Sequence, residues 1–207
     1  MKRDKTGKKT DKKIVLASES PSRKNILKLS GIDFVSIVSG VNEDEIKDIF
    51  KGSPKELALI LAEAKAISVS KKIQSALVIG ADQVLSFRGK PFNKPRSLRQ
   101  AKENLLLFKG KKHTLESATT IAYGGKIIWR YQDSPCLTMR RFSNKFLNIY
   151  IKKAGKNTLL SSGGYSIEKE GSQLFSKIEG EFFSIIGLPL VPLLGKLRKL
   201  KARGIED

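Results

Sequence analysis

The segment that most constrains the fold lies near the N-terminus, where a short apolar run changes abruptly into a polar turn and then a helical pattern. Residues 14–16 (Ile-Val-Leu) are apolar and mostly β-branched, which favours a buried strand. Pro21, followed by the periodic Ile26, Leu27 and Leu29, predicts a helix that begins at the proline. A strand that leads directly into a helix is typical of an α/β fold.

The turn between this strand and this helix carries groups that suit an anion. Ser18 and Ser20 supply hydroxyls and Arg23 supplies a guanidinium, beside the unpaired N–H groups and the positive dipole end of the helix. Such groups can converge on a phosphate. In the alternative interpretation, Ser20 only caps the helix and Arg23 is an exposed residue of the first turn.

A second informative segment is the apolar run at residues 76–85, which is typical of a fully buried strand. Asp82 and Gln83 interrupt it near its far end. An unpartnered buried carboxylate would cost several kcal/mol, so Asp82 requires a divalent metal, a lysine or a water molecule that it activates. Alternatively, Asp82 caps a turn and the nearby Gly80 marks a bend.

The rest of the chain alternates between strand and helix patterns and shows neither an internal repeat nor a linker. Ser53 and Pro54 predict the start of a helix whose apolar face excludes Lys65. Lys65 therefore points either toward a cleft or toward solvent, and solvent is favoured for this residue considered alone. The predicted elements are strands at 14–18, 34–38 and 76–87, helices at 21–30, 54–72, 97–109, 143–153 and from about 189, a β-rich stretch at 113–141 with a hairpin turn at Gly124-Gly125, and short strands between 164 and 179.

The chain carries a net charge of +20, from 40 Lys and Arg against 20 Asp and Glu. Residues 1–13 are rich in lysine without apolar residues after Met1, and this predicts a disordered tail. Most of the excess lies elsewhere. It favours polyanionic partners in general, either nucleotides in a cleft or nucleic acid bound weakly on the surface, or it reflects lysines on solvated faces. Because no nucleic-acid-binding module is recognisable, we expect no specific nucleic acid partner.

A single cysteine, Cys136, and a single histidine, His113, exclude a disulfide framework and a Cys/His zinc cluster. They also leave only one candidate base for a Ser-His-Asp triad, and no G-x-S-x-G elbow is present. We expect both residues to be structural. No apolar stretch approaches the length of a membrane span and no secretory signal is visible, so we expect a cytoplasmic protein without a membrane partner.

Taken together in order along the chain, these motifs resemble the Maf family of septum-formation-inhibitor-like nucleoside triphosphate pyrophosphatases. The resemblance extends from Lys13 to about Leu200. It implies a Maf/ITPase-like α/β fold: a central twisted mixed β-sheet with flanking helices, and two lobes around a nucleotide-binding cleft, within a single domain at 14–203. Its motifs are the turn at 18–23, Val41-Asn42-Glu43, Ala64-Lys65-Ala66, Asp82-Gln83, Lys94-Pro95, Gly164 to Glu168, Ile178-Glu179-Gly180 and Gly187 to Leu190.

The activity implied by this resemblance is cleavage of a nucleoside triphosphate between the α- and β-phosphates. Asp82 matches the proposed proton acceptor, and Glu43 is expected to bind metal or orient water. Glu179 is a weaker candidate metal ligand beside Glu43 and Asp82, and Mg²⁺ or Mn²⁺ is the expected cofactor because carboxylate and phosphate oxygens suit hard cations. A homodimer is also implied. The residues expected to hold phosphate are Ser18, Ser20, Arg23, Lys65 and Lys94.

Three departures from the commonest family pattern concern the choice of base. Ser22, Gln83 and Glu168 replace the Arg, Thr and Gln of members similar to dTTP/UTP pyrophosphatases. This combination is similar to the subfamily that hydrolyses 7-methyl-GTP, which implies removal of a non-standard purine from the nucleotide pool. Asn42 and Glu181 also replace residues that are usually Asp. The alternatives are a nucleotide-sensing regulator of cell division, a dTTP/UTP-type pyrophosphatase, and a basic nucleic-acid-binding protein that uses the α/β domain as a scaffold.

Overall fold

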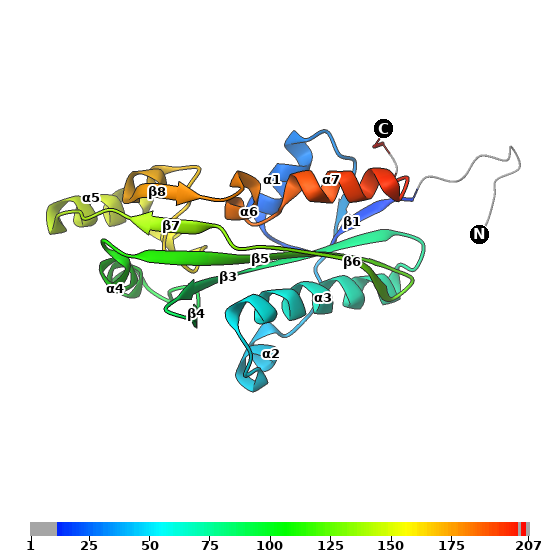
Figure 1. Ribbon diagram of the computed structural model, residues 1–207, viewed down its shortest axis with the longest axis horizontal. Coiled ribbons are helices and arrows are strands. Elements are labelled where there is room, and N and C mark those ends of the chain that lie inside the picture. The colour runs from blue at the N-terminus through cyan, green and yellow to red at the C-terminus, as the bar shows by residue number, and fades with distance from the viewer. Residues whose placement is uncertain (1–11, 203, 206–207) are drawn as a thin grey trace, which may run out of the picture.

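The fold is organised around two long antiparallel strands, β3 (Leu77–Phe87) and β5 (Lys112–Tyr123), which run through the middle of the molecule (Figure 1). In this computed structural model, which describes residues 12–202 and 204–205, their pairing extends from Val78 opposite Ala122 to Ser86 opposite Thr114. All residues of β3 except the half-buried Gln83 are buried, as the apolar run predicts.

These two strands belong to a mixed sheet with the order β2-β1-β3-β5-β7-β8, with β4 added to β3 and β6 added to β5. Strand β1 is parallel to β2 and to β3, while every other pairing along this order is antiparallel. The mixed sheet and its flanking helices confirm the predicted α/β class. The remaining strands are β1 (Ile14–Leu16), β2 (Val35–Ser36), β4 (Lys90–Phe92), β6 (Lys126–Asp133), β7 (Cys136–Met139) and β8 (Phe175–Glu179).

Helices cover both faces of the sheet, and the alternation of side chains along β3 decides which residue meets which helix. Leu77 and Ile79 pack with apolar residues of α1 (Pro21–Leu29) and α7 (Leu190–Lys199). The intervening Val78 and the later Val84 face α3 (Pro54–Lys72) instead. Figure 1 shows α3 on one side of the sheet and α1 and α7 on the other.

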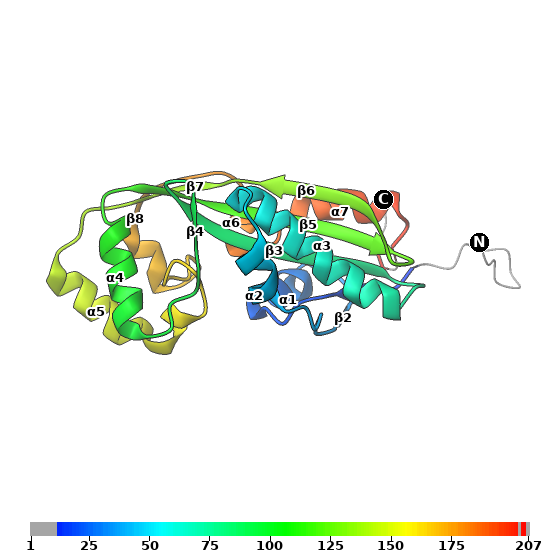
Figure 2. The same cartoon turned by 90° about the horizontal axis from the view of Figure 1, so that it is seen from below.

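Two hydrophobic cores lie at opposite ends of the long strands and define two lobes. The first is built on Leu77, Ile79 and Ile121, and the second on Leu85, Phe87 and their neighbours. The second, which we call the distal lobe, contains α4 (Leu98–Phe108), α5 (Asn144–Ala154) and two 3₁₀ helices at Gly155–Leu159 and Glu170–Leu174. Figure 2 shows α4 and α5 at one end of the molecule, away from α1, α2 and α3.

The predicted helix at 54–72 is confirmed residue for residue, with a capping box at Ser53 and Glu56. The hairpin is confirmed too, since Gly124 and Gly125 have φ values of 57° and 76°. Two short helices were not predicted, α2 (Glu43–Ile49) and α6 (Phe182–Ile186). Between residues 164 and 179 the structure has one strand preceded by a 3₁₀ helix, not several strands.

The predicted boundary of the N-terminal tail differs from the structure. Lys12 forms a β-bridge with Ala202, and the carbonyl of Lys13 accepts a hydrogen bond of 2.9 Å from the N–H of Leu77. Both lysines are therefore part of the fold, although we predicted that they belong to the tail. Disorder was also predicted for residues 1–11, which lie outside the described residues. None of the helices in the described ranges has the length and apolarity to traverse a lipid bilayer.

Candidate active site

A cleft of about 600 Å³ opens between the two lobes. One wall comes from the turn before α1 and from α2 and α3, and the other from segments 91–96 and 160–168. The middle of β3 runs between these walls. The cleft brings together all but one of the predicted site residues: Ser18, Ser20, Ser22, Arg23, Glu43, Lys65, Asp82, Gln83, Lys94 and Glu168.

The centre of the cleft is a lysine held between two carboxylates. The ammonium nitrogen Nζ of Lys65 lies 2.6 Å from Oδ1 of Asp82 and 2.6 Å from Oε1 of Glu43. Lys65 and Asp82 are each 7% exposed, so the carboxylate on β3 has the partner that its burial requires. The helical position of Lys65 alone favoured an orientation toward solvent, and this prediction is therefore wrong.

Gly80 explains how Lys65 reaches Asp82. A Cβ atom at Gly80 would lie 2.2 Å from the carbonyl oxygen of Ala62 and 2.8 Å from Cβ of Ala66. Only glycine allows α3 to approach β3 this closely. Gly80 and Asp82 lie on the same face of the strand, so the close approach places Lys65 above Asp82. Gly80 does not mark a bend, because it lies within the regular pairing of β3 with β5.

Electrostatics keep the second carboxylate charged. Burial of Glu43 acts to raise its pKa, but the ammonium groups of Lys65 and Lys47 outweigh burial and bring that pKa to about 2. Lys47 lies one turn along α2, with Nζ 3.1 Å from Oε2 of Glu43. Glu43 is therefore ionised at any pH near neutrality.

Arg23 is buried at the start of α1, not exposed as in the alternative interpretation of its motif. Its Nε donates a hydrogen bond of 2.8 Å to the carbonyl of Gly187, and Nη1 donates to Oγ of Ser18 at 3.4 Å. Burial lowers the pKa of Arg23, while Asp82 and Glu43 oppose this effect. This role of Gly187 was not predictable from its motif. The glycine ends α6 with a φ of 112°, which other residues rarely adopt.

The two serines of the turn have different partners. Oγ of Ser20 accepts from the N–H of Arg23 at 3.5 Å, so the predicted cap is present. Oγ of Ser18 accepts from the N–H of Ser20 at 3.2 Å. Both hydroxyls line the cleft, which means that capping and contact with a ligand are compatible for Ser20.

The three residues predicted to select the base also line the cleft. Oγ of Ser22 donates to Oε1 of Glu168 at 3.3 Å, across 146 positions of sequence. Nε2 of Gln83 donates to the carbonyls of Ser184 (2.7 Å) and Ile185 (3.1 Å). Both donor hydrogens of this amide are thereby used, so Gln83 offers its oxygen as an acceptor. Glu168 is exposed and offers two more acceptors.

Lys94 lies exposed on the wall of the cleft that belongs to the distal lobe. Glu179 is the predicted site residue that the cleft does not include. It lies at the end of the edge strand β8, where its carboxylate pairs with Lys177 at 2.6 Å. Lys177 is two residues away and therefore on the same face of the strand. Glu181, which was not assigned a role, caps α6 by accepting from the N–H groups of Phe183 and Ser184.

The donor set in the cleft fits a divalent cation that also binds phosphate. Asp82 and Glu43 lie close together, since Oδ1 of Asp82 and Oε1 of Glu43 are each 2.6 Å from the ammonium nitrogen of Lys65. Because that ammonium group lies between them, a metal ion would be held by carboxylate lone pairs that Lys65 does not use. No cluster of three potential metal-ligating side chains occurs among residues 12–202 and 204–205. Mg²⁺ commonly uses one or two carboxylates together with substrate phosphates, so two neighbouring carboxylates are sufficient.

The sequence matches the family model Maf, described as Maf-like protein, over residues 13–200. It is similar over nearly its whole length to a nucleoside triphosphate pyrophosphatase of Granulibacter bethesdensis, with 43% identity covering 92% of this chain and 98% of that protein. A 7-methyl-GTP pyrophosphatase of Brucella suis shows 43% identity over 91% of this chain and 96% of its own. A second 7-methyl-GTP pyrophosphatase, from Bartonella quintana, shows 45% identity over 90% and 95%.

Proposed function

The chain belongs to the Maf family, and from this membership we propose that it hydrolyses nucleoside triphosphates between the α- and β-phosphates, releasing a nucleoside monophosphate and pyrophosphate. The observation that carries the proposal is the ammonium group of Lys65, held at 2.6 Å from both Asp82 and Glu43 beside the buried Arg23. This arrangement supports the proposal, because a carboxylate that can accept a proton lies next to cations that can bind phosphate.

Binding of the triphosphate uses the cations and hydroxyls of the cleft. Arg23 offers N–H groups in a rigid fork, and Lys65 and Lys94 act as point charges on either wall. Ser18 and Ser20 donate hydroxyl hydrogens to phosphate oxygens. These contacts hold the chain of phosphates across β3 and fix the α-phosphate close to Asp82.

The reaction itself requires a water molecule aligned with the α-phosphate. Oxygen of this water forms the new bond to phosphorus while the bond to the bridging oxygen breaks, and the electron pair leaves with pyrophosphate. Asp82 accepts the proton released by the water, and Lys65 orients the Asp82 carboxylate. Glu43 holds Lys65 from the other side, which keeps the ammonium group between the two acids.

The charges that line the cleft support the need for a divalent metal. Five cations and five carboxylates line it, so the protein alone offers no excess positive charge to a triphosphate of about four negative charges. We propose that Asp82 and Glu43 would hold Mg²⁺ or Mn²⁺ together with phosphate oxygens, through the carboxylate lone pairs that Lys65 leaves free. When bound, this metal neutralises phosphate charge and polarises the phosphorus–oxygen bond. The lining residues with charge are Glu19, Arg23, Glu43, Asp44, Lys47, Lys65, Asp82, Lys94, Arg96 and Glu168.

The base proposed for the substrate is 7-methylguanine. Gln83 and Glu168 present acceptor oxygens, and the edge of guanine presents an N1–H and an amino group as donors. The positive charge of a 7-methylated purine also favours the carboxylate of Glu168 over a neutral amide. The two relatives named 7-methyl-GTP pyrophosphatase support the same substrate. Hydrolysis of such a nucleotide would clear a non-standard purine from the pool.

We further propose a homodimer and a cytoplasmic location. The resemblance to the Maf family supports the dimer, and a substrate drawn from the nucleotide pool supports the location. Sedimentation analysis of the purified chain measures the first directly. A monomer at all accessible concentrations would contradict it.

Release of pyrophosphate from a panel of triphosphates tests the activity. The panel contains GTP, 7-methyl-GTP, dTTP, UTP and ATP, each with Mg²⁺ or Mn²⁺ and with the metal chelated. We expect metal-dependent release with the highest kcat/KM for 7-methyl-GTP. Turnover of dTTP or UTP in preference to 7-methyl-GTP would contradict the proposed base, whereas binding without turnover would favour a nucleotide sensor.

A further inference from the structure

The positive charge of this chain is concentrated in the distal lobe. Segments 88–112 and 140–179 contain 17 lysines and arginines but only four acidic residues, Glu103, Glu168, Glu170 and Glu179. In contrast, residues 12–87 contain 11 lysines and arginines against 9 acidic residues. A general enrichment in lysine would affect both parts of the molecule. The imbalance is therefore a property of one lobe and calls for a local explanation.

Six of these cations gather where three segments of the distal lobe meet: the turn between β3 and β4, the turn between α4 and β5, and the end of β7. The turn between α4 and β5 is joined to the end of β7 by a hydrogen bond of 3.0 Å from the N–H of Met139 to the carbonyl of Lys111. Arg141 lies over the turn between α4 and β5, because a methyl group at Gly110 would come within 3.1 Å of its Cγ. We call this group the tip cluster: Arg88, Lys109, Lys111, Lys112, Arg140 and Arg141.

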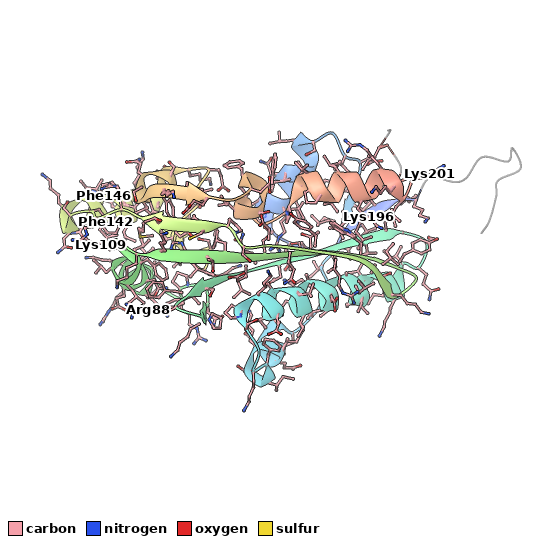
Figure 3. All side chains as sticks on the ribbon, viewed as in Figure 1. Arg88, Lys109, Phe142, Phe146, Lys196 and Lys201 are labelled. Atoms are coloured by element: carbon pink, nitrogen blue, oxygen red, sulfur yellow. The ribbon has the colours of Figure 1, made fainter. Side chains whose placement is uncertain are left out.

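Aromatic rings, not carboxylates, lie beside four members of the tip cluster, and backbone carbonyls hold two of these four as well. Nζ of Lys111 donates to the carbonyl of Leu107 at 2.8 Å, and Nε of Arg140 donates to the carbonyl of Gln173 at 2.6 Å. The ring of Phe87 lies 5.3 Å from Cζ of Arg88 and 5.7 Å from Nζ of Lys111. Arg140 lies 4.1 Å from the ring of Phe146. Lys109 lies 5.5 Å from Phe142, and Figure 3 shows Lys109 with Phe142 and Phe146 at one end of the molecule and Arg88 nearby.

Within the part of the chain that the structure describes, no member of the tip cluster forms a salt bridge. The carboxylate of Glu179, whose pKa is lowered chiefly by a hydrogen bond from Lys177 and less by Lys112, is paired with Lys177. Four of the six cations are thus ordered beside aromatic rings, and the charge of the cluster is available to another molecule. Ordering in advance lowers the entropy cost of binding.

We propose that the tip cluster binds the phosphodiester backbone of a nucleic acid without regard to sequence, at a surface separate from the cleft. A cluster of ordered cations suits the repeated phosphates of a polynucleotide, and release of counterions drives such binding. Two of the rings beside the cations are closed to insertion, since Phe87 and Phe142 are 5% and 4% exposed, while Phe146 is half-buried and covered by Arg140. A lipid surface is the weaker match because stable membrane binding by basic residues requires an apolar anchor.

The test uses the full chain and two variants with the same change in net charge. In the tip variant, Lys111→Gln, Lys112→Gln and Arg141→Gln remove three cations while leaving those over Phe142 and Phe146. In the control variant, Lys196→Gln, Lys199→Gln and Lys201→Gln remove three cations near the opposite end of the molecule, where Figure 3 labels Lys196 and Lys201. The N-terminal segment is present in both, so its contribution cancels.

Fluorescence anisotropy measures binding to a labelled single-stranded RNA and to a duplex DNA of equal length, over a series of salt concentrations. We expect the tip variant to bind at least about tenfold more weakly than the parent, with the slope of log K against log salt reduced by about 2, and the control to match the parent. Hydrolysis of a small triphosphate and the melting temperature should stay unchanged in both variants. The two polymers distinguish a preference for single strands from a preference for duplexes.

Three results would overturn the proposal. The first is the absence of binding to either polymer at low salt. The second is equal loss of affinity in both variants, which would assign binding to overall charge. The third is binding to vesicles that contain phosphatidylserine without binding to either nucleic acid, which would assign the tip cluster to a lipid surface.

Discussion

At the scale of single residues, the effect of a substitution in the cleft depends on which partners each acidic side chain has. Asp82 shares Lys65 with Glu43, and Lys65 therefore retains a counter-ion when either acid is changed. A buried lysine left without any partner would cost about 3–5 kcal/mol, but a lysine with one remaining acid avoids most of this cost. Function and folding can thus be separated by a single substitution.

We expect Asp82→Asn to fold normally and to lose at least about a hundredfold in turnover, the usual scale for removal of a general base. Pyrophosphate release measures the loss, and thermal unfolding checks the fold. The matched control is Glu179→Gln, which changes an acid outside the cleft. Near-normal turnover of Asp82→Asn would exclude Asp82 as the proton acceptor.

The choice of base is also decided by single residues. We expect the double variant Gln83→Thr/Glu168→Gln to lose its preference for 7-methyl-GTP over UTP by at least about tenfold, because hydrogen bonds from the guanine edge to the carboxylate are removed. The ratio of kcat/KM for the two substrates is the measurement. If the ratio in the double variant equals that of the parent, neither residue reads the base.

At the scale of elements, the sequence predicted β1, α1, α3 and β3 because each carries its own pattern and start signal. The position of Lys65 was not predictable in this way, because it depends on the distance between α3 and β3. That distance is set by Gly80, which acts through a contact far away in sequence. Helix α2 was missed because it is only seven residues long, although Asn42 supplies its cap.

Gly80→Ala tests this account of how α3 is placed. The added methyl group would overlap the carbonyl of Ala62, so we expect destabilisation of about 1–3 kcal/mol and a large fall in kcat/KM as Lys65 moves away from Asp82. Urea unfolding and the pyrophosphate assay give the two values. Gly195→Ala in α7 is the control, because nothing lies within 4 Å of its added Cβ and stability should stay equal or rise. Equal behaviour of the two variants would refute the role of Gly80.

Glu179 is the reverse case of Lys65: the sequence predicted it in the site, but the structure places it outside the cleft. Its motif suggested a metal ligand, yet the structure places its carboxylate on an edge strand beside Lys177. Spacing along the chain does not reveal which edge of a sheet a strand will occupy. Of the predicted cleft residues, those next to β1 and β3 were the most predictable, because these strands lead directly into the cleft.

At the scale of the whole molecule, stability should depend on pH through His113, which lies in the core of the distal lobe. Its ring stacks on Phe108, and Nε2 lies 2.7 Å from the hydroxyl of Tyr165. Nδ1 has no hydrogen-bond partner in the described part of the chain. Burial lowers the pKa of His113 from 6.5 to about 4, so the imidazole is neutral in the folded protein at physiological pH.

The unfolded chain binds a proton at His113 below about pH 6.5, whereas the folded chain does so only below about pH 4. The contribution to stability is therefore complete above pH 6.5 and is lost progressively toward pH 4, by up to about 3 kcal/mol. Urea unfolding at pH 7, 5.5 and 4.5 measures this loss. The variant His113→Gln should show a shallower dependence on pH over this range, and an identical dependence would mean that other groups are responsible.

The continuity of β3 and β5 has a mechanical consequence. Both strands pass from one lobe to the other while paired from Val78 to Ser86, so the lobes are connected by a hydrogen-bonded ribbon and not by a single loop. Domains joined by loops open at a few backbone dihedral angles. Here the lobes can separate only if the whole ribbon changes its twist, and the width of the cleft is therefore governed by the elasticity of the sheet.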